Sequence, residues 1–168
     1  QEVVGEILIK NADAGASPNS NASSDKVTII DDFAHHPTAV LETLKGIRNR
    51  FPGRRIVALF EPRSNTSRRK MFEHTYPAAL ATADLIGIKT PPYRAEVDAG
   101  QDLLDPHVIE RDVQALGKEI ILTETTDELV AAMSPHILPG DVIVVMSNGA
   151  FDGIHGKVAA ALWESTSK

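Results

Sequence analysis

Acidic, aromatic and imidazole side chains gather directly after an apolar run near the start of the chain. The stretch "TIIDDFAHHPTAV" contains two acids, an aromatic ring and two imidazoles: Asp31, Asp32, Phe33, His35 and His36. Carboxylates and imidazoles bind zinc, manganese or iron, and they also act as general acids and bases. Adjacent side chains on an extended segment point to opposite faces, so this spacing disfavours a metal site.

Two other interpretations of this stretch stay open. Asp32, at the end of a strand, can accept hydrogen bonds from a ligand hydroxyl such as that of ribose. Alternatively, Asp31 or Asp32 caps the following turn and the imidazoles pack beside it. We expect a functional role for Asp32 and His35, with His35 also a candidate catalytic residue. His36 precedes Pro37 and is equally a candidate helix cap.

A second polar segment, "EPRSNTS", follows another apolar run. Arg63 can hold a carboxylate through a bidentate pair of hydrogen bonds. Ser64, Asn65 and Thr66 can bind polar groups of a ligand or cap the next helix. A cap does not explain Arg63, which we therefore expect to bind an anionic ligand. The nearby basic residues at 68–70 are either part of that anion site or a solvated helix start.

A third segment, "MSNGAFDGIHG", combines a polar pair with three glycines before a helical pattern. Glycine permits a close approach of the backbone to an anion. Asn148 and His155 are candidate ligand contacts here. The segment matches neither GxGxxG nor GxxxxGK[ST], so these glycines alone do not predict a nucleotide site.

These segments each follow an expected strand of an α/β fold. Short apolar runs alternate with amphipathic stretches, which is typical of βα units around a mostly parallel sheet. The expected strands are 1–10, 26–30, 55–60, 84–89, 119–122 and 141–146. The expected helices run from Pro37 to before 51–53, over 67–83, from Asp105, from Thr125 to near 139–140, and over 154–163. We predict a Rossmann-like three-layer domain with about six strands.

The composition of the chain argues against some classes of partner and location. The 168 residues include no cysteine and carry a net charge of −6, which argues against nucleic acid as the main partner. The apolar runs are shorter than the ~20 residues of a membrane-spanning helix, and we expect a cytoplasmic protein. Small and polar residues fill 11–25, for which we predict a flexible loop.

Together, "DDFAHHPTAV", "FEPRSNTS" and "MSNGAFDGIHGK" resemble the C-terminal domain of the Mur ligases, the ATP-dependent amide ligases of peptidoglycan synthesis. The resemblance covers about residues 26–164. It is strongest to the ligases of murein recycling, which join the tripeptide L-alanyl-γ-D-glutamyl-meso-diaminopimelate to UDP-N-acetylmuramate through an acyl phosphate. The resemblance implies that residues 1–168 are a single domain of a three-domain enzyme. The N-terminal and central domains would then be its partners. They would bind the UDP-sugar and Mg²⁺ and make most of the contacts with the phosphates of ATP.

The resemblance also implies roles for residues. It gives Asp32 a contact with the ribose of ATP, Phe33 a place near the adenine, and His35 the place of the family histidine in that loop. It implies that Arg63, Ser64, Asn65 and Thr66 bind the incoming peptide. It assigns Asn148 and His155 more loosely to the peptide pocket. No metal ligand is implied in this chain, and the isolated domain is expected to be inactive.

Two alternatives remain. The first is a sister ligase that adds L-alanine to UDP-N-acetylmuramate, whose members resemble "PHRFTRT" where this chain has "EPRSNTS". The second is a stand-alone Rossmann-like binding module without chemistry. The length of the natural protein and its preference for tripeptide or alanine separate these hypotheses.

Overall fold

The computed structural model of the protein describes residues 2–8 and 26–166. The polar loop predicted at 11–25 lies outside the described residues. Within this part of the chain, no helix is long and apolar enough to cross a membrane.

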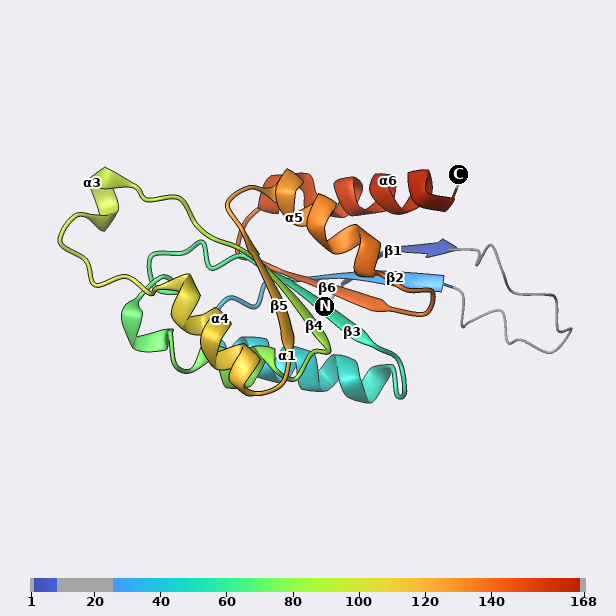
Figure 1. The fold of residues 1–168 in the computed structure, drawn as a ribbon, viewed down its shortest axis with the longest axis horizontal. Coiled ribbons are helices and arrows are strands. Elements are labelled where there is room, and N and C mark those ends of the chain that lie inside the picture. The colour runs from blue at the N-terminus through green and yellow to red at the C-terminus, as the bar shows by residue number, and fades with distance from the viewer. Residues whose placement is uncertain (1, 9–25, 167–168) are drawn as a thin grey trace, which may run out of the picture.

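The described strands form one twisted sheet at the centre of the molecule (Figure 1). They are β1 (Glu2–Leu8), β2 (Lys26–Asp32), β3 (Ile56–Phe60), β4 (Leu85–Lys89), β5 (Glu119–Thr123) and β6 (Val142–Met146). Their order across the sheet is β1-β2-β6-β3-β4-β5. Only β1 runs antiparallel to its neighbour, and the other described pairs are parallel. The predicted α/β class and mostly parallel sheet are confirmed.

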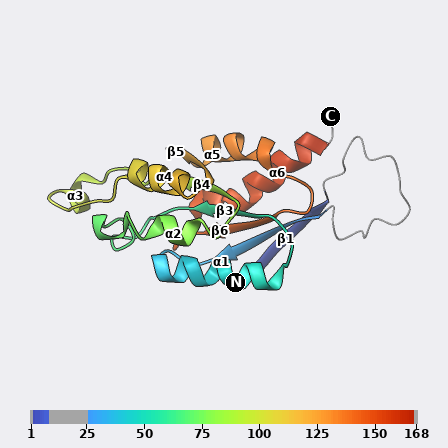
Figure 2. The ribbon, with the colours of Figure 1, turned by 60° about the horizontal axis from the view of Figure 1, so that its bottom comes forward.

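Helices cover both faces of the sheet and complete three layers. They are α1 (Pro37–Arg50), α2 (Tyr76–Leu80), α3 (Ala95–Asp98), α4 (Pro106–Ala115), α5 (Thr126–Met133) and α6 (Ile154–Thr166). Short 3₁₀ turns lie at η1 (Lys70–Phe72), η2 (Ser134–His136) and η3 (Phe151–Gly153). Figure 2 shows α1 and α2 on one side of the strands and α5 and α6 on the other.

Two separate hydrophobic cores follow from the alternation of side chains along the strands. On β3, Ile56, Ala58 and Phe60 pack into the core beneath α1, α2 and α4. Val57 and Leu59 point the opposite way, into the core beneath α5 and α6. The central strands are therefore buried on both faces, which explains their continuous apolar sequences.

Several helices begin at the capping and first-turn residues predicted from the sequence. Pro37 occupies the first turn of α1, where its missing N–H costs no hydrogen bond. The Asp105 carboxylate accepts a hydrogen bond from the backbone N–H of His107 at 2.9 Å. Thr125 and Glu128 form the expected capping box of α5.

His36 stands at the N-cap position of α1 but makes no capping hydrogen bond. Its ring instead packs edge-on against Phe72, with the ring centroids 4.6 Å apart. The residue therefore contributes packing at this helix end, and the cap considered for it is absent.

The single helix predicted over 67–83 is wrong. The segment contains only η1 and α2, separated by turns. Arg69 forms a β-bridge with Leu103, and the Lys70 N–H donates to the Asp102 carbonyl at 3.0 Å, so these backbone groups are used in tertiary pairing. Pro77 lacks an N–H and fits only the first turn of α2.

The helix from Thr125 also ends earlier than predicted. It ends at Met133 rather than near 139–140, and η2 continues from it with Pro135 in its first turn. The short helix α3 has no counterpart among the elements expected from the sequence.

The strand order brings the polar segments to one edge of the sheet. Strands β2, β6, β3 and β4 are consecutive neighbours and parallel. Their carboxyl ends therefore place the loops that begin at Phe33, Ser147, Glu61 and Thr90 side by side. In open α/β sheets, this is the edge where ligands bind.

Candidate functional site

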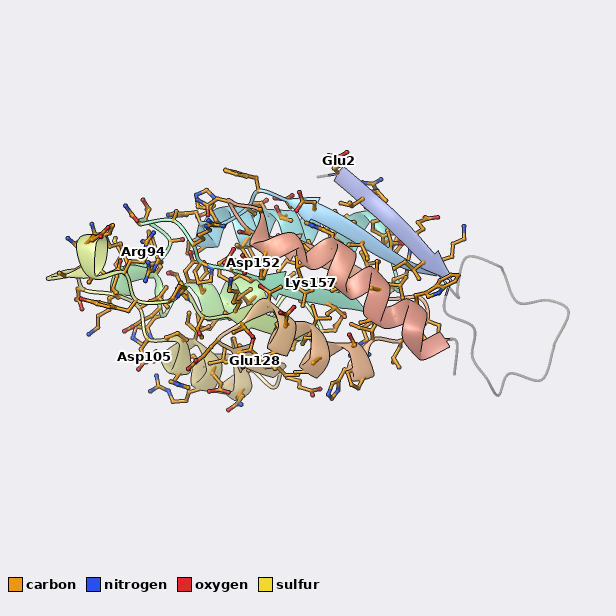
Figure 3. All side chains as sticks on the ribbon, turned by 90° about the horizontal axis from the view of Figure 1, so that it is seen from above. Glu2, Arg94, Asp105, Glu128, Asp152 and Lys157 are labelled. Carbon is orange, nitrogen blue, oxygen red and sulfur yellow. The ribbon has the colours of Figure 1, made fainter. Side chains whose placement is uncertain are left out.

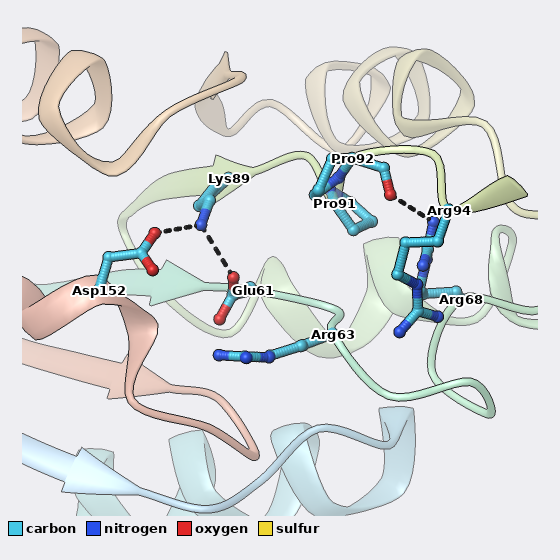
Figure 4. Close-up of a pocket in the computed structure, with 8 residues that line it drawn as sticks. All are labelled: Glu61, Arg63, Arg68, Lys89, Pro91, Pro92, Arg94 and Asp152. Atoms are coloured by element: carbon cyan, nitrogen blue, oxygen red, sulfur yellow. Dashed lines mark hydrogen bonds and ion pairs between the residues drawn. The ribbon is translucent and has the colours of Figure 1, made fainter. Parts of the chain in front are cut away.

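A cavity of about 240 Å³ opens at this edge, between the loops that follow β3, β4 and β6. Its walls carry mainly charged side chains, with two prolines on one side (Figure 4). The lining residues are Glu61, Arg63, Arg68, Lys89, Pro91, Pro92, Arg94 and Asp152.

Lys89, the last residue of β4, holds two of these loops together. Its ammonium group donates to Glu61 Oε1 at 3.1 Å and forms a second short ion pair with Asp152. Ser147 Oγ donates to the other Glu61 oxygen at 2.9 Å. Burial lowers the pKa of Lys89, but the bonds to Asp152 and Glu61 outweigh that effect, so its pKa is raised above the ordinary value. Lys89 is thus a fixed cation and not a proton donor at neutral pH.

Asp152 reaches Lys89 from an unusual turn. Phe151 has a φ angle of 43° and Asp152 a φ angle of 48°. Both angles lie in the left-handed region that non-glycine residues seldom adopt. Asp152 is held there by Lys89 and by Thr126 Oγ1, which donates at 2.8 Å. These hydrogen bonds lower the pKa of the Asp152 carboxyl group. Strain of this kind is common where a loop must deliver a side chain to a site.

Arg63 crosses from the β3 loop to the β6 loop. A Cβ atom added to Gly149 would lie 2.7 Å from Arg63 Nη1. The guanidinium thus passes so close over that glycine that any larger residue at 149 would force Arg63 to move. Arg63 is exposed and has no hydrogen bond or ion pair with the described residues. Its donors are therefore available to a ligand. The predicted role of this arginine in binding an anion stays a prediction.

Arg68 and Arg94 line the opposite side of the cavity and share one buried carboxylate. Arg68 Nη2 donates to Asp98 Oδ2 at 2.7 Å, and Arg94 Nη2 lies 3.4 Å from Asp98 Oδ1. Arg68 is 3% exposed, so the solvated basic helix start that the sequence left open is excluded for this residue. Figure 3 shows Arg94 beside α3 and Asp152 at the start of α6.

The loop after β2 lies beside this cavity without lining it. Asp32 Oδ1 accepts a hydrogen bond from the Ala34 N–H at 2.8 Å, so this carboxylate closes the turn, one of the two roles expected for it. Phe33 is 68% exposed. The His35 Nδ1–H donates to the Phe33 carbonyl at 2.9 Å, and the two rings meet edge-on.

The predicted residues after Arg63 divide between capping and the cavity rim. Ser64 Oγ accepts from the Ser67 N–H at 3.0 Å and acts as a local cap. Asn65 is exposed and its oxygen accepts from Arg94 at 2.7 Å. Thr66 is exposed and does not line the cavity. Asn65 thus contacts the cavity residue Arg94 through its side chain, whereas Ser64 contacts the cavity residue Arg68 only through its backbone carbonyl, which accepts from the Arg68 N–H at 3.2 Å.

The side chains of Asn148 and His155 lie in different places in the structure. The Asn148 amide oxygen is buried and finds no partner among the described residues. It adjoins Gly149 and therefore the Arg63 side of the cavity. His155 Nε2 pairs with Asp31 Oδ1 at 3.0 Å and lines a different cavity between β1 and α6. The two residues do not form one site in this arrangement.

Sequence reasoning missed Glu61, Lys89, Arg94 and Asp152. A charged residue that ends a buried apolar run, as Lys89 ends "LIGIK", was the available signal. Burying such a charge is costly unless it is paired, so a buried Lys89 requires an acidic partner elsewhere in the fold. Nothing local identifies Asp152 as that partner.

The described side chains can also be compared with the metal site and the nucleotide site considered for the sequence. They contain no group of three or more His, Asp or Glu residues that could hold a metal ion. Asp32 ends β2 and the exposed ring of Phe33 follows it, and their expected contact with a nucleotide stays a prediction.

Comparison with known proteins identifies the family. Residues 20–149 match the family described as "Mur ligase, glutamate ligase domain", which covers most of the chain. The chain belongs to the Mur ligase family. Members of this family use ATP and Mg²⁺.

Individual Mur ligases are similar over the same region. The UDP-N-acetylmuramate–L-alanyl-γ-D-glutamyl-meso-2,6-diaminoheptandioate ligase of Escherichia coli is 36% identical over 140 residues, which are 81% of this chain and 28% of that protein. A UDP-N-acetylmuramate–L-alanine ligase of Paraburkholderia phytofirmans is 33% identical over 82% of this chain and 29% of its own length. The chain thus spans less than a third of these curated relatives.

Solved Mur ligase structures share the fold. A domain from Haemophilus ducreyi, described as part of a UDP-N-acetylmuramate:L-alanyl-γ-D-glutamyl-meso-diaminopimelate ligase, matches with a TM-score of 0.62 and 30% identity, over 96% of this chain and 98% of that one. The murein peptide ligase of Psychrobacter arcticus matches with a TM-score of 0.65 and 32% identity, over 81% of this chain and 27% of that one.

Proposed function

We propose that this chain is the C-terminal domain of an ATP-dependent ligase that joins L-alanyl-γ-D-glutamyl-meso-diaminopimelate to UDP-N-acetylmuramate in peptidoglycan recycling. The observation that carries the proposal is the cationic cavity at the carboxyl edge of the sheet, where Arg63 has donors without a partner among the described residues. A peptide with several carboxylates suits this cavity. The similarity to the Escherichia coli and Haemophilus ducreyi proteins supports the same choice.

The reaction would use this domain for positioning. ATP supplies the phosphoryl group that activates the carboxylate of UDP-N-acetylmuramate, and the family's Mg²⁺ would be bound mostly by the central domain. Arg63 would hold a carboxylate of the incoming peptide and so direct the peptide's amine. Fixing two reactants in one geometry lowers the barrier without a protein nucleophile. The Lys89 ion pairs would keep the Arg63 loop in place.

Asp32, Phe33 and His35 would face ATP across the boundary with the central domain. The exposed ring of Phe33 is available to stack on adenine. Asp32 has one oxygen bonded to the turn, and its carboxylate stands at the end of β2 where a ribose hydroxyl would bind. Closure of this domain in the cytoplasm of the cell would exclude water from the acyl phosphate.

A UDP-N-acetylmuramate–L-alanine ligase is the second candidate, because a relative with that name is 33% identical to the chain. The full-length enzyme should be assayed with UDP-N-acetylmuramate, ATP and Mg²⁺, and with tripeptide or L-alanine as the amine. We expect a higher kcat/KM for the tripeptide. A higher kcat/KM for L-alanine refutes the proposed substrate.

Two substitutions in the same enzyme separate the two loops. Asp32→Ala should raise the KM for ATP with little change in the KM for the peptide, whereas Arg63→Ala should raise the KM for the peptide by about 10-fold or more. Arg111→Ala is the matched control, because Arg111 is exposed on α4 and pairs only with Asp112 next to it among the described residues. The opposite pattern of KM changes would mean that the roles of the two loops are exchanged.

A further inference from the structure

Positive and negative side chains are distributed unequally between the two sides of the cavity. Lys89 lies between the two carboxylates of Glu61 and Asp152, whose two negative charges more than balance its one positive charge. On the other side, Arg68 and Arg94 share the single carboxylate of Asp98. Two guanidinium groups on one carboxylate leave one positive charge without a counter-charge from residues 2–8 and 26–166. That excess lies apart from Arg63, as Figure 4 shows, on the side of the cavity formed by the prolines at 91–92.

Hydrogen bonds fix this second cationic group firmly. Arg68 Nη2 donates to the Pro92 carbonyl at 2.8 Å as well as to Asp98. The Arg94 backbone N–H donates to Asp98 Oδ2 at 2.6 Å, and Arg94 Nη2 donates to Asn65 at 2.7 Å. The carboxylate of Asp98, a residue that is 4% exposed, thus holds both arginines and the turn that carries Arg94.

Some donors of these arginines remain unused. The Nε atoms of Arg68 and Arg94 are buried, and neither has a hydrogen-bond partner in the part of the chain that the structure describes. A buried donor without an acceptor is unfavourable, and nearly all such groups in proteins find a partner. The side chain of Arg94 is 37% exposed, so an anionic ligand group can approach its guanidinium from the cavity and balance the extra positive charge.

We propose that Arg68, Asp98 and Arg94 form a second carboxylate-binding subsite, in which Arg94 contacts the ligand and Asp98 is a positioning residue. The proposal rests on the proposed function. The tripeptide carries a carboxylate on its D-glutamyl residue and two on diaminopimelate, whereas L-alanine has only one. Arg63 and Arg94 would read two different carboxylates of one peptide, and the second contact would favour tripeptide over alanine.

The test combines substitutions in the full-length enzyme with amidated peptides. KM and kcat are measured for the tripeptide and for three forms, each with one carboxylate converted to a carboxamide. For wild-type enzyme, we expect two of the amidated forms, one lacking the carboxylate read by Arg63 and one lacking the carboxylate read by Arg94, to show a KM about 10- to 100-fold higher, as expected for loss of one charge-assisted contact. Arg94→Ala should raise the KM of the unmodified tripeptide by a similar factor and abolish the difference between the tripeptide and one of these two forms, while the other form keeps its difference.

This comparison distinguishes ligand contact from a structural role. If Arg94 only stabilised its loop, Arg94→Ala would raise the KM of all peptides equally and the acid-to-amide ratio would stay as in wild type, which overturns the proposal. Arg94→Lys should restore part of the ratio because it keeps the charge. Asp98→Asn should lower the ratio while Arg94 is still present. Arg111→Gln, on α4, is the charge-matched control and should leave the ratio unchanged.

The two proposals fail in different ways. An enzyme that ligates L-alanine in preference to the tripeptide refutes the proposed function, and the second subsite with it. An enzyme that prefers the tripeptide but whose acid-to-amide ratios do not respond to Arg94→Ala refutes the subsite alone.

Discussion

Replacing Lys89 with methionine tests whether its ion pairs hold the cavity loops together. Methionine has a similar length and keeps the apolar packing of the side chain, but it removes the ammonium group. Glu61, whose side chain is 4% exposed, then loses its cationic partner and keeps only the hydrogen bond from Ser147. The side chain of Asp152 is 53% exposed, so its carboxylate stays hydrated.

The cost comes mainly from the buried carboxylate. Removing one partner of a buried ion pair costs about 3–5 kcal/mol because an uncompensated charge remains. The side chain of Lys89 is 11% exposed. We therefore expect the lower end, about 3 kcal/mol less free energy of unfolding at neutral pH. For a protein of this size, that corresponds to a decrease in Tm of about 6–12 °C.

The pH dependence follows from the shifted pKa values. Bonds to Asp152 and Glu61 raise the pKa of Lys89 despite burial, so its stabilising effect is complete below the ordinary value of 10.5 and is lost as pH rises through the folded value. The bond from Lys89 lowers the pKa of Asp152, so that contribution is present above 3.8 and is lost as pH falls. The difference between wild type and Lys89→Met should therefore be largest between about pH 4 and about pH 10.

The assay is thermal and urea unfolding of the chain, followed by circular dichroism, for wild type, Lys89→Met, Glu61→Gln and the double variant. We expect the double variant to be more stable than Lys89→Met, because glutamine leaves no buried charge unpaired. A Tm for Lys89→Met within about 2 °C of wild type would refute this reasoning. So would strictly additive effects of the two substitutions.

Two further predictions concern other contacts of the same edge. Tyr76→Phe removes the hydroxyl that donates to the carbonyls of His35 at 2.7 Å and Ser67 at 3.2 Å. Urea unfolding should show a loss of about 1–2 kcal/mol, and an unchanged urea midpoint would show that these bonds contribute nothing. Gly149→Val displaces Arg63, which is exposed and can move away. The Tm should then stay within about 2 °C of wild type while the KM for peptide in the full-length enzyme rises. An unchanged KM would show that Arg63 needs no approach over Gly149 to bind.

The elements that the sequence predicts well depend on local chemistry. Pro37 at the first turn of α1 and the capping box of Thr125 and Glu128 each satisfy their own backbone groups within a few residues. The segment 67–83 is predicted poorly because its backbone pairs with residues distant in the sequence, at Asp102 and Leu103. Helical spacing of apolar residues carries no information about backbone pairing with a distant segment, which here replaces the helical hydrogen bonds.

The candidate site divides in the same way. Arg63 is a candidate from the sequence because a helix cap does not explain an arginine near the end of a buried strand, and the structure places it in the wall of the cavity. Arg68 and Arg94 cannot be assigned from the sequence, since their role follows from one carboxylate at Asp98 that the fold buries between them. His155 and Asn148 are close in sequence, but the turn at η3 sends the His155 side chain to Asp31 instead.

The sequence by itself determined the α/β class, the family and the edge of the sheet where polar loops meet, because strand periodicity, caps and motifs are properties of short segments. Only the tertiary structure decided which charges stand together. Glu61 and Asp152 lie 28 and 63 positions from Lys89 along the chain, and each follows a different strand. Their pairing results from the strand order β6-β3-β4, and a long-range order of this kind is written in no single stretch of residues.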